Sequence, residues 1–353
     1  MNSTTSPEKV LTEAYVADVK RRLEMHPIEF EERIPTLGKP LIIESACPGW
    51  QSTHWGPPEF YPVKPPGYKP GGIRYAAIPV SIEDQVKTDV EAIRAGAACL
   101  HHHPRDPETG ISATMTPKHH PVLAEVYGQV FKQVDAITLE HTWFRQPDGS
   151  FDYIPDTQKL LELGKGNRYC QGAVTMWPPN HSYPRNYARV VQEGVKFMEA
   201  NHVKPIHKLR CGYSVREMVR LLLDTGIMTH KPYVLVHDMG HPYGWPLDMD
   251  PWMPIDLVAS IMQTKQRIPD SIIGVYSGGR NWLPITITAI LMGVDIVRTG
   301  IEDTYWMYPH KDDVIQSNQE AVKKIVGFCN FIGRPIATVE QARQIMGIKL
   351  TSR

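Results

Sequence analysis

The sequence predicts an α/β protein folded as a (β/α)8 TIM barrel, and three observations lead to this prediction. Eight short apolar runs alternate with eight amphipathic stretches, an order that requires parallel strands joined by crossover helices. These repeats fill roughly 300 of the 353 residues, which suits a closed barrel better than an open sheet. A content of 42% hydrophobic and 22% charged residues is typical of a globular chain. An open doubly wound sheet is the structural alternative.

The elements follow one another in a regular order along the chain. The expected strands are short apolar runs at 40–46, 98–103, 136–141, 170–177, 205–211, 233–237, 272–276 and 295–300. The expected helices have amphipathic spacing and lie at 81–96, 117–133, 156–164, 184–202, 214–227, 251–266, 281–293 and 318–332. In the first of these helices, Ser81 is placed to cap the N-terminus and Gly96 to end the helix.

Two parts of the chain stand outside this alternation. Residues 1–37 form a charged N-terminal extension, so the barrel with its C-terminal helices is expected over 38–353. Residues 48–79 are rich in proline and aromatic residues, and proline at this density excludes regular helix and central strand. We interpret this stretch as a long surface excursion after the first strand.

Charge and cysteine usage exclude several classes of protein. The 38 basic and 38 acidic side chains cancel, and a pI near 7.3 gives no support for a nucleic-acid or membrane-surface partner. No run approaches the ~20 apolar residues of a transmembrane helix, and the polar start does not resemble a secretory signal. The five cysteines lie far apart without a CxxC pair, which indicates reduced, mostly buried thiols in a cytoplasmic protein.

The active site of such a barrel forms at the carboxyl ends of its strands, so polar residues there are the candidates for chemistry. The second strand ends in His101, His102 and His103. Because strand side chains alternate, His101 and His103 share one face and His102 points to the other. Two imidazoles on one face at a barrel mouth can bind a single metal ion. The alternative is a partly solvated strand end without a ligand.

The eighth strand supplies a third metal-ligand candidate. If the extended conformation persists, Arg298, Gly300 and Glu302 face one way, with Asp303 just beyond the strand. An inward Glu302 would complete a His2Glu zinc site that keeps a coordination position open for substrate. The second and eighth strands both flank the first in a closed barrel, so these groups are within reach of one another. The alternative is a structural ion pair between Arg298 and a carboxylate.

Three other strands offer weaker candidates. Glu44 interrupts the apolar first strand, where an acid is either a site residue or the partner of a buried arginine. The third strand ends at His141 and Thr142, and the fourth carries the hydroxyl group of Thr175. Each of these polar residues is placed to contact a substrate.

The loop after the seventh strand predicts an anion site. Gly279 and Arg280 precede a helix, so free backbone amides and a guanidinium would meet where such barrels commonly bind phosphate. The alternative is an ordinary glycine turn. Neither a GxGxxG nor a GxxxxGK[ST] pattern is present in the sequence. We interpret His237 as a residue lining the pocket, and His119 and His120 as surface residues.

Three segments together resemble one known family. AGAACLHHHPRDPETG resembles its second-strand signature, GGRNWLPITITAILMGVDIVRTGIED its C-terminal signature, and KPLIIESACPG its first strand. The sequence is similar over roughly residues 38–335 to the β-keto acid cleavage enzymes, typified by 3-keto-5-aminohexanoate cleavage enzyme. The C-terminal block is the most specific part of this resemblance.

The resemblance implies a zinc-dependent barrel that converts a β-keto acid and acetyl-CoA into acetoacetate and a new CoA thioester. By this resemblance His101, His103 and Glu302 match the zinc ligands, Asp303 the general base, and Arg298 the arginine that assists it. It further implies a homo-oligomer, expected to be a tetramer, with a small-molecule β-keto acid and acetyl-CoA as its partners.

Substrate contacts are implied for the remaining candidates. Glu44 matches an acid on the first strand, His141 or Thr142 stands where the family has a serine or threonine, and Thr175 is a looser match. The loop of Gly279 and Arg280 would hold a phosphate of CoA.

The fifth strand departs from the family, which commonly carries acids there. Here the strand reads KPIHKLR, and only one of His207 and Lys208 can face inward. A basic group in the pocket favours an anionic or neutral tail over an amine. In the alternative, both residues lie outside the pocket and the aromatic stretch 50–68 recognises the tail. Two other functions remain open: a zinc-dependent aldolase or hydrolase that does not use CoA, and a non-catalytic barrel that binds metabolites.

Overall fold

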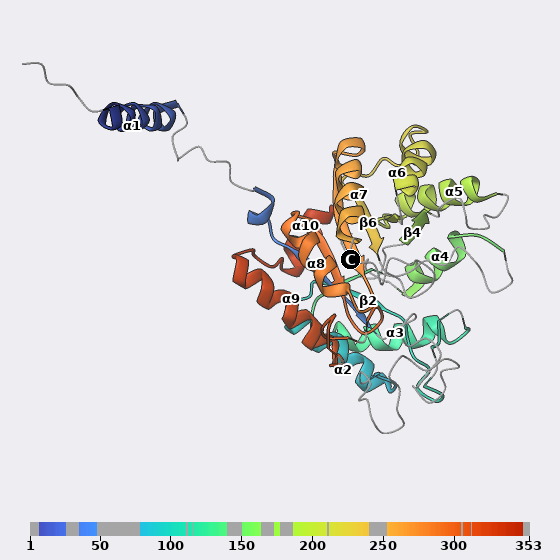
Figure 1. Cartoon of the computed structure of the whole chain (residues 1–353). Coiled ribbons are helices and arrows are strands. Elements are labelled where there is room, and N and C mark those ends of the chain that lie inside the picture. The colour runs from blue at the N-terminus through green and yellow to red at the C-terminus, as the bar shows by residue number, and fades with distance from the viewer. Residues whose placement is uncertain are drawn as a thin grey trace, which may run out of the picture.

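The chain forms a barrel of eight parallel strands with helices around it, as shown by a computed structural model (Figure 1). The structure describes residues 7–25, 35–47, 78–110, 112–114, 116–139, 150–163, 173–176, 186–209, 212–239, 253–304, 306–311 and 313–348. The strands are β1 (Ile42–Cys47), β2 (Cys99–His102), β3 (Ile137–Thr138), β4 (Ala173–Met176), β5 (Ile206–Leu209), β6 (Tyr233–Met239), β7 (Ser271–Ser277) and β8 (Ile296–Thr299).

The strand order distinguishes the barrel from an open sheet. It runs β3-β2-β1-β8-β7-β6-β5-β4, so the first strand pairs with both the second and the last. A doubly wound sheet would leave the first and last strands apart, and this alternative is therefore excluded. The order ends at β3 and β4, the two strands that closure of the barrel would bring together. No pairing between these two is present in the described ranges, and 140–149 and 164–172 beside them lie outside those ranges.

The helices between the strands confirm the expected alternation. They are α2 (Ile82–Arg94), α3 (His119–Val130), α4 (Ile154–Leu163), α5 (Tyr187–Ala200), α6 (Gly212–Met218), α7 (Met253–Arg267), α8 (Trp282–Leu291) and α9 (Asn318–Ile332). Ser81 caps α2 as predicted, because its side chain accepts a hydrogen bond from the Asp84 amide. A single π-helical turn, Val219–Leu223, continues α6 where one longer helix was expected.

Two helices were not predicted individually. The α1 helix (Pro7–Met25) lies within the N-terminal extension, and a 3-10 turn, Pro35–Gly38, precedes β1. The α10 helix (Val339–Met346) follows the barrel and begins with a capping box formed by Thr338 and Gln341. No helix in the described part of the chain is long and apolar enough to cross a membrane.

The barrel interior changes from apolar to polar along the strands. Ile42, Ile206 and Ile296, from three different strands, belong to one buried cluster, which also includes Met346 of α10. Because these strands are not all neighbours, their side chains meet inside the barrel, and α10 closes its N-terminal end. The next inward positions carry charged and polar side chains, among them Glu44 and Arg298. The polar layer thus lies toward the carboxyl ends of the strands.

Candidate active site

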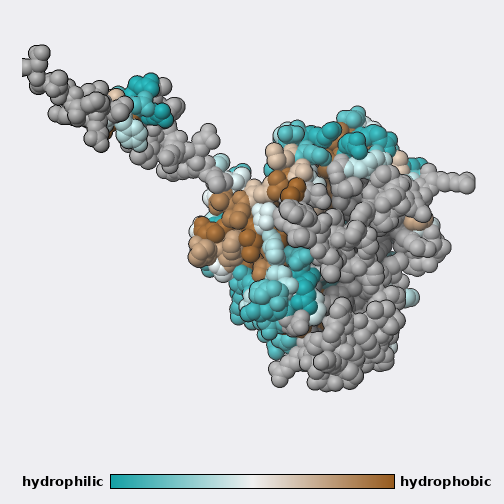
Figure 2. Space-filling view, viewed as in Figure 1, coloured by the Kyte–Doolittle hydropathy of each residue, from teal (hydrophilic) through white to brown (hydrophobic). Residues whose placement is uncertain are grey.

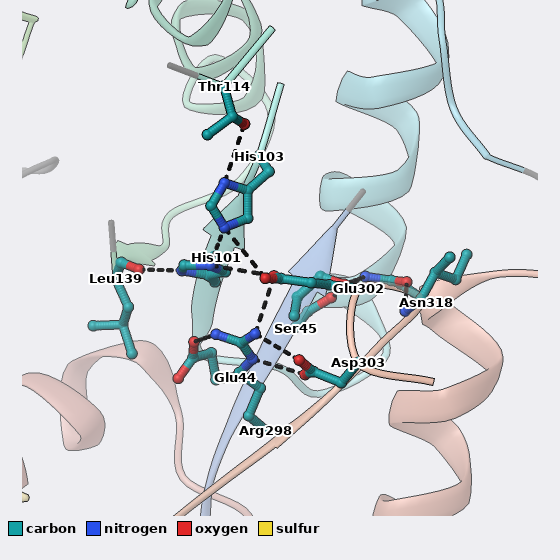
Figure 3. A network of polar contacts seen from close by, with 12 residues as sticks. Glu44, Ser45, His101, His103, Thr114, Leu139, Arg298, Glu302, Asp303 and Asn318 are labelled. Carbon is teal, nitrogen blue, oxygen red and sulfur yellow. Dashed lines mark hydrogen bonds and ion pairs between the residues drawn. The ribbon is translucent and has the colours of Figure 1, made fainter. Parts of the chain in front are cut away.

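Two histidines and one carboxylate converge at the carboxyl end of the barrel. His101 and His103 project from β2 and its end into the interior, with their Nε2 atoms 2.9 Å apart. Each Nε2 lies 3.2 Å from a different oxygen of Glu302, which follows β8 (Figure 3). All three side chains are at most 2% exposed. The structure brings these residues together as the strand alternation predicts.

Contacts on the far side of each ring orient the two imidazoles. His101 Nδ1 lies 2.6 Å from the carbonyl oxygen of Leu139, which can only accept, so this nitrogen carries the hydrogen. His103 Nδ1 lies 3.2 Å from the hydroxyl of Thr114. Burial lowers the pKa of His101 to about 3, and its ring is therefore neutral near pH 7. A neutral ring with hydrogen on Nδ1 points the Nε2 lone pair at Glu302.

This arrangement fits a metal ion. The ligand atoms of His101, His103 and Glu302 all lie within 4.8 Å of one another. A tetrahedral Zn²⁺ with bonds of ~2.0–2.1 Å places its ligand atoms roughly 3.3 Å apart, close to the distances here. Two imidazole nitrogens and one carboxylate form the donor set of catalytic zinc sites, and a buried carboxylate between two rings favours a cation. Leu139 and Thr114 orient the rings as outer partners of metal-binding histidines do.

Glu302 reaches the site through a turn and not through an extended strand. Gly300 has φ +147°, and a Cβ there would lie 2.2 Å from the Ala46 carbonyl oxygen, so glycine is required. The expectation that extension persists to Glu302 is therefore wrong, although the residue still faces the site. Asn318 at the start of α9 fixes the turn: it accepts from the Ile301 amide and donates to Ala46 O.

Arg298 connects the acidic residues of the site. Its Nε and Nη2 donate to the two oxygens of Asp303 at 2.8 and 2.6 Å, a bidentate pair. Nη2 also lies 3.1 Å from Glu302, and Nη1 lies 3.7 Å from Glu44 (Figure 3). Burial opposes ionisation of Glu302, but the positive charge of Arg298 outweighs it and holds the pKa of Glu302 well below its usual value. The guanidinium thus keeps the carboxylate of Glu302 charged.

Glu44 occupies the interior next to these groups. Its side chain is fully buried, and burial raises its pKa to about 7 although the neighbouring Arg298, Tyr276 and Lys208 lower it. The two interpretations of Glu44 as a site residue and as the partner of a buried arginine are therefore compatible. Its carboxyl group lies 3.7 Å from Arg298, which also contacts Glu302.

The structure decides which fifth-strand residue faces inward. Lys208 Nζ lies 5.5 Å from the centre of the Tyr276 ring, and its charge acts on Glu44, so its side chain points into the barrel. His207 therefore points outward, toward the helices, and is buried there. Burial lowers the pKa of His207 to about 3, so it contributes no positive charge near pH 7. Of the two fifth-strand residues, Lys208 is therefore the basic one that faces the barrel interior.

The predicted anion loop is largely engaged in internal contacts. The Gly279 amide donates to the Asp303 carbonyl oxygen at 2.9 Å. Arg280 stacks on Trp306, 3.7 Å from the ring centre, and donates to the Lys311 carbonyl oxygen at 2.8 Å. The Gly279 amide thus supports the turn that carries Asp303 and is not free for a ligand. Arg280 is the charged residue of this loop that could contact an anion.

The predicted substrate contacts on the third and fourth strands involve side chains that the structure does not describe. His141 and Thr142 lie outside the described residues, as does most of the excursion 48–79, and Thr175 lies on β4 beside Lys208 without a described side chain.

Three histidines were placed incorrectly. His119 is buried, with 4% exposure, and the His120 side chain is 21% exposed beside Asp156, so neither is a plain surface residue. His237 does not line the pocket, because it faces α7 and bonds to Thr264 at 3.1 Å. The strand and helix patterns gave no indication of these partners.

Two residues that support the site were not predicted from the sequence. They are Thr114, which contacts His103, and Asn318, which contacts the turn before Glu302. Thr114 lies in a loop after β2, and Asn318 lies 16 positions after Glu302 at a helix start. Neither belongs to a motif with metal-ligand spacing, and each acts by touching a residue distant in the sequence. No local pattern could have identified them.

Comparisons with known proteins were consistent with one another. The model of the beta-keto acid cleavage enzyme family matches residues 67–348. A 3-keto-5-aminohexanoate cleavage enzyme of Acetoanaerobium sticklandii is 33% identical over 153 residues, which cover 43% of this chain and 51% of the relative. A 3-dehydrocarnitine:acetyl-CoA trimethylamine transferase of Rhizobium meliloti is 24% identical over 308 residues, covering 78% of this chain and 91% of the relative.

Two further observations qualify these matches. The aligned part of the chain spans about half the length of the two cleavage enzymes that it matches. Among solved structures, apo ObcA superposes with a TM-score of 0.59 at 16% identity, covering 77% of this chain and 65% of that chain. Identity this low supports the barrel fold alone.

Proposed function

The chain belongs to the beta-keto acid cleavage enzyme family, and from this premise we propose that it converts a β-keto acid and acetyl-CoA into acetoacetate and a new acyl-CoA. The observation that carries the proposal is the convergence of His101, His103 and Glu302 beside the Arg298–Asp303 pair. Relatives named as a 3-dehydrocarnitine:acetyl-CoA trimethylamine transferase and a 3-oxoadipate:acetyl-CoA acetyltransferase support acetyl-CoA as the co-substrate.

His101, His103 and Glu302 would hold the metal, which we propose to be Zn²⁺. When bound, Zn²⁺ supplies Lewis-acid polarisation of the substrate carbonyl. Asp303 takes a proton from C2 of the β-keto acid, and Arg298 holds this carboxylate in a fixed orientation through two hydrogen bonds. The C2 carbanion attacks the thioester carbonyl of acetyl-CoA and expels the CoA thiolate, which adds to the original keto carbonyl. The bond between that carbon and C2 then breaks to give the new acyl-CoA, and C2 takes the proton back from Asp303 as acetoacetate is released.

Further roles are proposed for residues around this centre. Glu44 contacts the substrate from β1, and His141, Thr142 and Thr175 do so from the third and fourth strands. Arg280, held on Trp306 at the loop after β7, contacts a phosphate of CoA. This contact would use the guanidinium, because the Gly279 amide is engaged with Asp303.

The reaction is tested with a panel of β-keto acids, each incubated with and without acetyl-CoA while acetoacetate is measured. We expect acetoacetate only when both substrates are present. Turnover of a β-keto acid without CoA would instead indicate an aldolase or hydrolase on the same barrel. Zinc binding without turnover of any member would favour a non-catalytic barrel.

Lys208 is predicted to set the preference for the substrate tail. An ammonium in a buried pocket repels a cationic tail, so we expect low kcat/KM for 3-keto-5-aminohexanoate and higher values for neutral or carboxylate-bearing β-keto acids. Replacing Lys208 by glutamate should shift the ratio of kcat/KM for the cationic substrate to kcat/KM for the anionic substrate by about tenfold or more in favour of the cationic one. A tenfold shift corresponds to roughly 1.4 kcal/mol. The measurement is kcat/KM for a cationic and an anionic substrate of similar length.

Lys208→Met is the matched control, because it keeps the length of the side chain and removes only the charge. It should give a ratio between those of the wild type and Lys208→Glu. A wild type that prefers the amine, or a preference unchanged in both variants, would favour recognition of the tail by residues 50–68 instead.

We also propose that the chain assembles as a homotetramer in the cytoplasm. Figure 2 shows apolar residues gathered on the outer surface near the C-terminal helices. Leu291 of α8 and Phe331 of α9 are large apolar side chains exposed by 48% and 86%, which supports a contact with other protein. The described cysteines Cys47, Cys99 and Cys329 are free, as expected for a reducing compartment. Light scattering would determine the assembly.

A further inference from the structure

The middle histidine of the β2 run points away from the barrel interior, towards α2. His102 is fully buried, and so are the two polar residues of α2 that contact it, Gln85 and Asp89. These two lie four residues apart, on the helix face that packs against β1 and β2. The same face buries Val86 and Val90. Polar groups in such an apolar layer need partners, and the β2 segment supplies them.

Every hydrogen-bonding position of the Gln85 amide is used. Its Nε2 donates to Val80 O at 2.8 Å and to Arg105 O at 3.0 Å, and its Oε1 accepts from the Arg105 amide at 3.0 Å. The amide cannot be reversed, because its NH2 group would then face the Arg105 N–H. Oε1 also lies 3.0 Å from His102 Nε2, so this ring nitrogen carries a hydrogen and donates it. Gln85 thus holds both the His102 side chain and the Arg105 backbone.

Asp89 holds the other nitrogen of the same ring. His102 Nδ1 lies 2.8 Å from Asp89 Oδ2, and the ring packs edge-on against Tyr127 with centroids 5.9 Å apart. The Cys47, Asp89 and His102 ligand atoms lie within 4.8 Å of one another, a grouping that could hold a metal ion. However, His102 Nε2 donates to Gln85, His102 Nδ1 contacts Asp89 directly, and burial raises the pKa of the Cys47 thiol. A support made of one hydrogen bond and one ion-pair contact explains this cluster better than a second metal site.

We propose that Gln85 and Asp89 are positioning residues for the metal site, acting through His102 and Arg105 on the backbone that carries His101 and His103. The inference rests on the metal site proposed above. Each metal-ligating histidine is a direct neighbour of His102 in the chain, and His103 lies between the two anchored residues. Metal–ligand distances are fixed to within about 0.2 Å. A strand end that shifts or twists when α2 releases it would lose this geometry.

The test compares the zinc affinity of variants that remove the support with that of a variant that removes an equivalent bond elsewhere. Gln85→Met and Asp89→Ala should bind zinc about 10- to 100-fold more weakly than the wild type, as when outer partners of metal-binding histidines are lost. The matched control is Thr264→Val, because Thr264 bonds from α7 to His237, an outward histidine of β6. Dissociation constants are measured by competition with a chromophoric chelator, and Co²⁺ absorption spectra report ligand geometry.

Asp89→Asn separates the contact from the charge, because its neutral amide keeps the size of the side chain and its NH2 group can donate to an unprotonated His102 Nδ1. Its zinc affinity should stay close to that of the wild type and well above that of Asp89→Ala, with a wild-type Co²⁺ spectrum. Thermal unfolding of every variant identifies any that fails to fold. Equal losses in Asp89→Asn and Asp89→Ala would contradict positioning through this bond.

Three further results would each lead to a different conclusion about the two proposals. Wild-type zinc affinity in Gln85→Met and Asp89→Ala, or an equal loss in Thr264→Val, would overturn the positioning role and leave the metal site intact. A second zinc ion that disappears in Cys47→Ser would replace the proposal with a metal site at Cys47, Asp89 and His102. A wild type that binds no zinc would overturn the proposed metal site, and the positioning role with it.

Discussion

Purified wild-type protein is expected to carry about one Zn²⁺ per chain, and His101→Ala and Glu302→Ala to lose it. Each substitution removes one of three protein ligands, and two ligands do not hold Zn²⁺ at a catalytic site. Metal content is measured by elemental analysis after dialysis against a chelator. Loss of a Lewis acid removes several kcal/mol of transition-state stabilisation, so turnover should fall by more than about 10³-fold.

The control for metal content is His237→Gln. This histidine is also buried at a strand position, but it faces α7 and can be replaced by an amide that still bonds to Thr264. It should retain full zinc content. Full occupancy in both His101→Ala and Glu302→Ala would exclude these residues as the ligands. Zinc loss in His237→Gln as well would show that metal content follows general destabilisation.

Periodicity was sufficient to predict the barrel and to place His102 on the opposite face of its strand from His101 and His103. The alternation of side chains along a strand separates His101 and His103 from His102, and it can be predicted from the sequence because it depends only on extended backbone. The same rule limited the fifth strand to one inward residue. It could not choose between His207 and Lys208, since the choice depends on strand register, which the contact of Lys208 with Tyr276 reveals.

Beyond the strand ends the backbone is no longer extended, so the alternation of side chains no longer predicts which way a residue faces. Glu302 reaches the site through a turn at Gly300, and its position depends on Asn318 and on the Ala46 carbonyl oxygen, more than 250 residues away in the sequence. His119 and His237 were misplaced for a related reason. Burial of a polar side chain is decided by partners from other elements, here Thr264 in the case of His237. Such tertiary contacts cannot be predicted from the spacing of residues along the chain.

Asp303→Asn is expected to keep its zinc and lose most of its turnover. Asparagine has nearly the same volume, but it cannot accept a proton, and general-base groups typically contribute ~10²–10⁴-fold. Zinc should remain because Asp303 contacts Arg298, whereas the ligand atoms belong to His101, His103 and Glu302. Hydrogen–deuterium exchange at C2 of the bound β-keto acid, without acetyl-CoA, isolates the proton-transfer step from thioester chemistry.

Asp135→Asn provides a matched control for this result. Asp135 forms a bidentate pair with Arg343 at 2.7 and 2.6 Å, the same kind of pair as Asp303 with Arg298, but outside the polar layer of the barrel. Its loss should leave C2 exchange unchanged. If Asp303→Asn exchanged at the wild-type rate, proton removal would belong to another group, and Glu44, with a pKa of about 7 and its place beside Arg298, would be the next residue to replace.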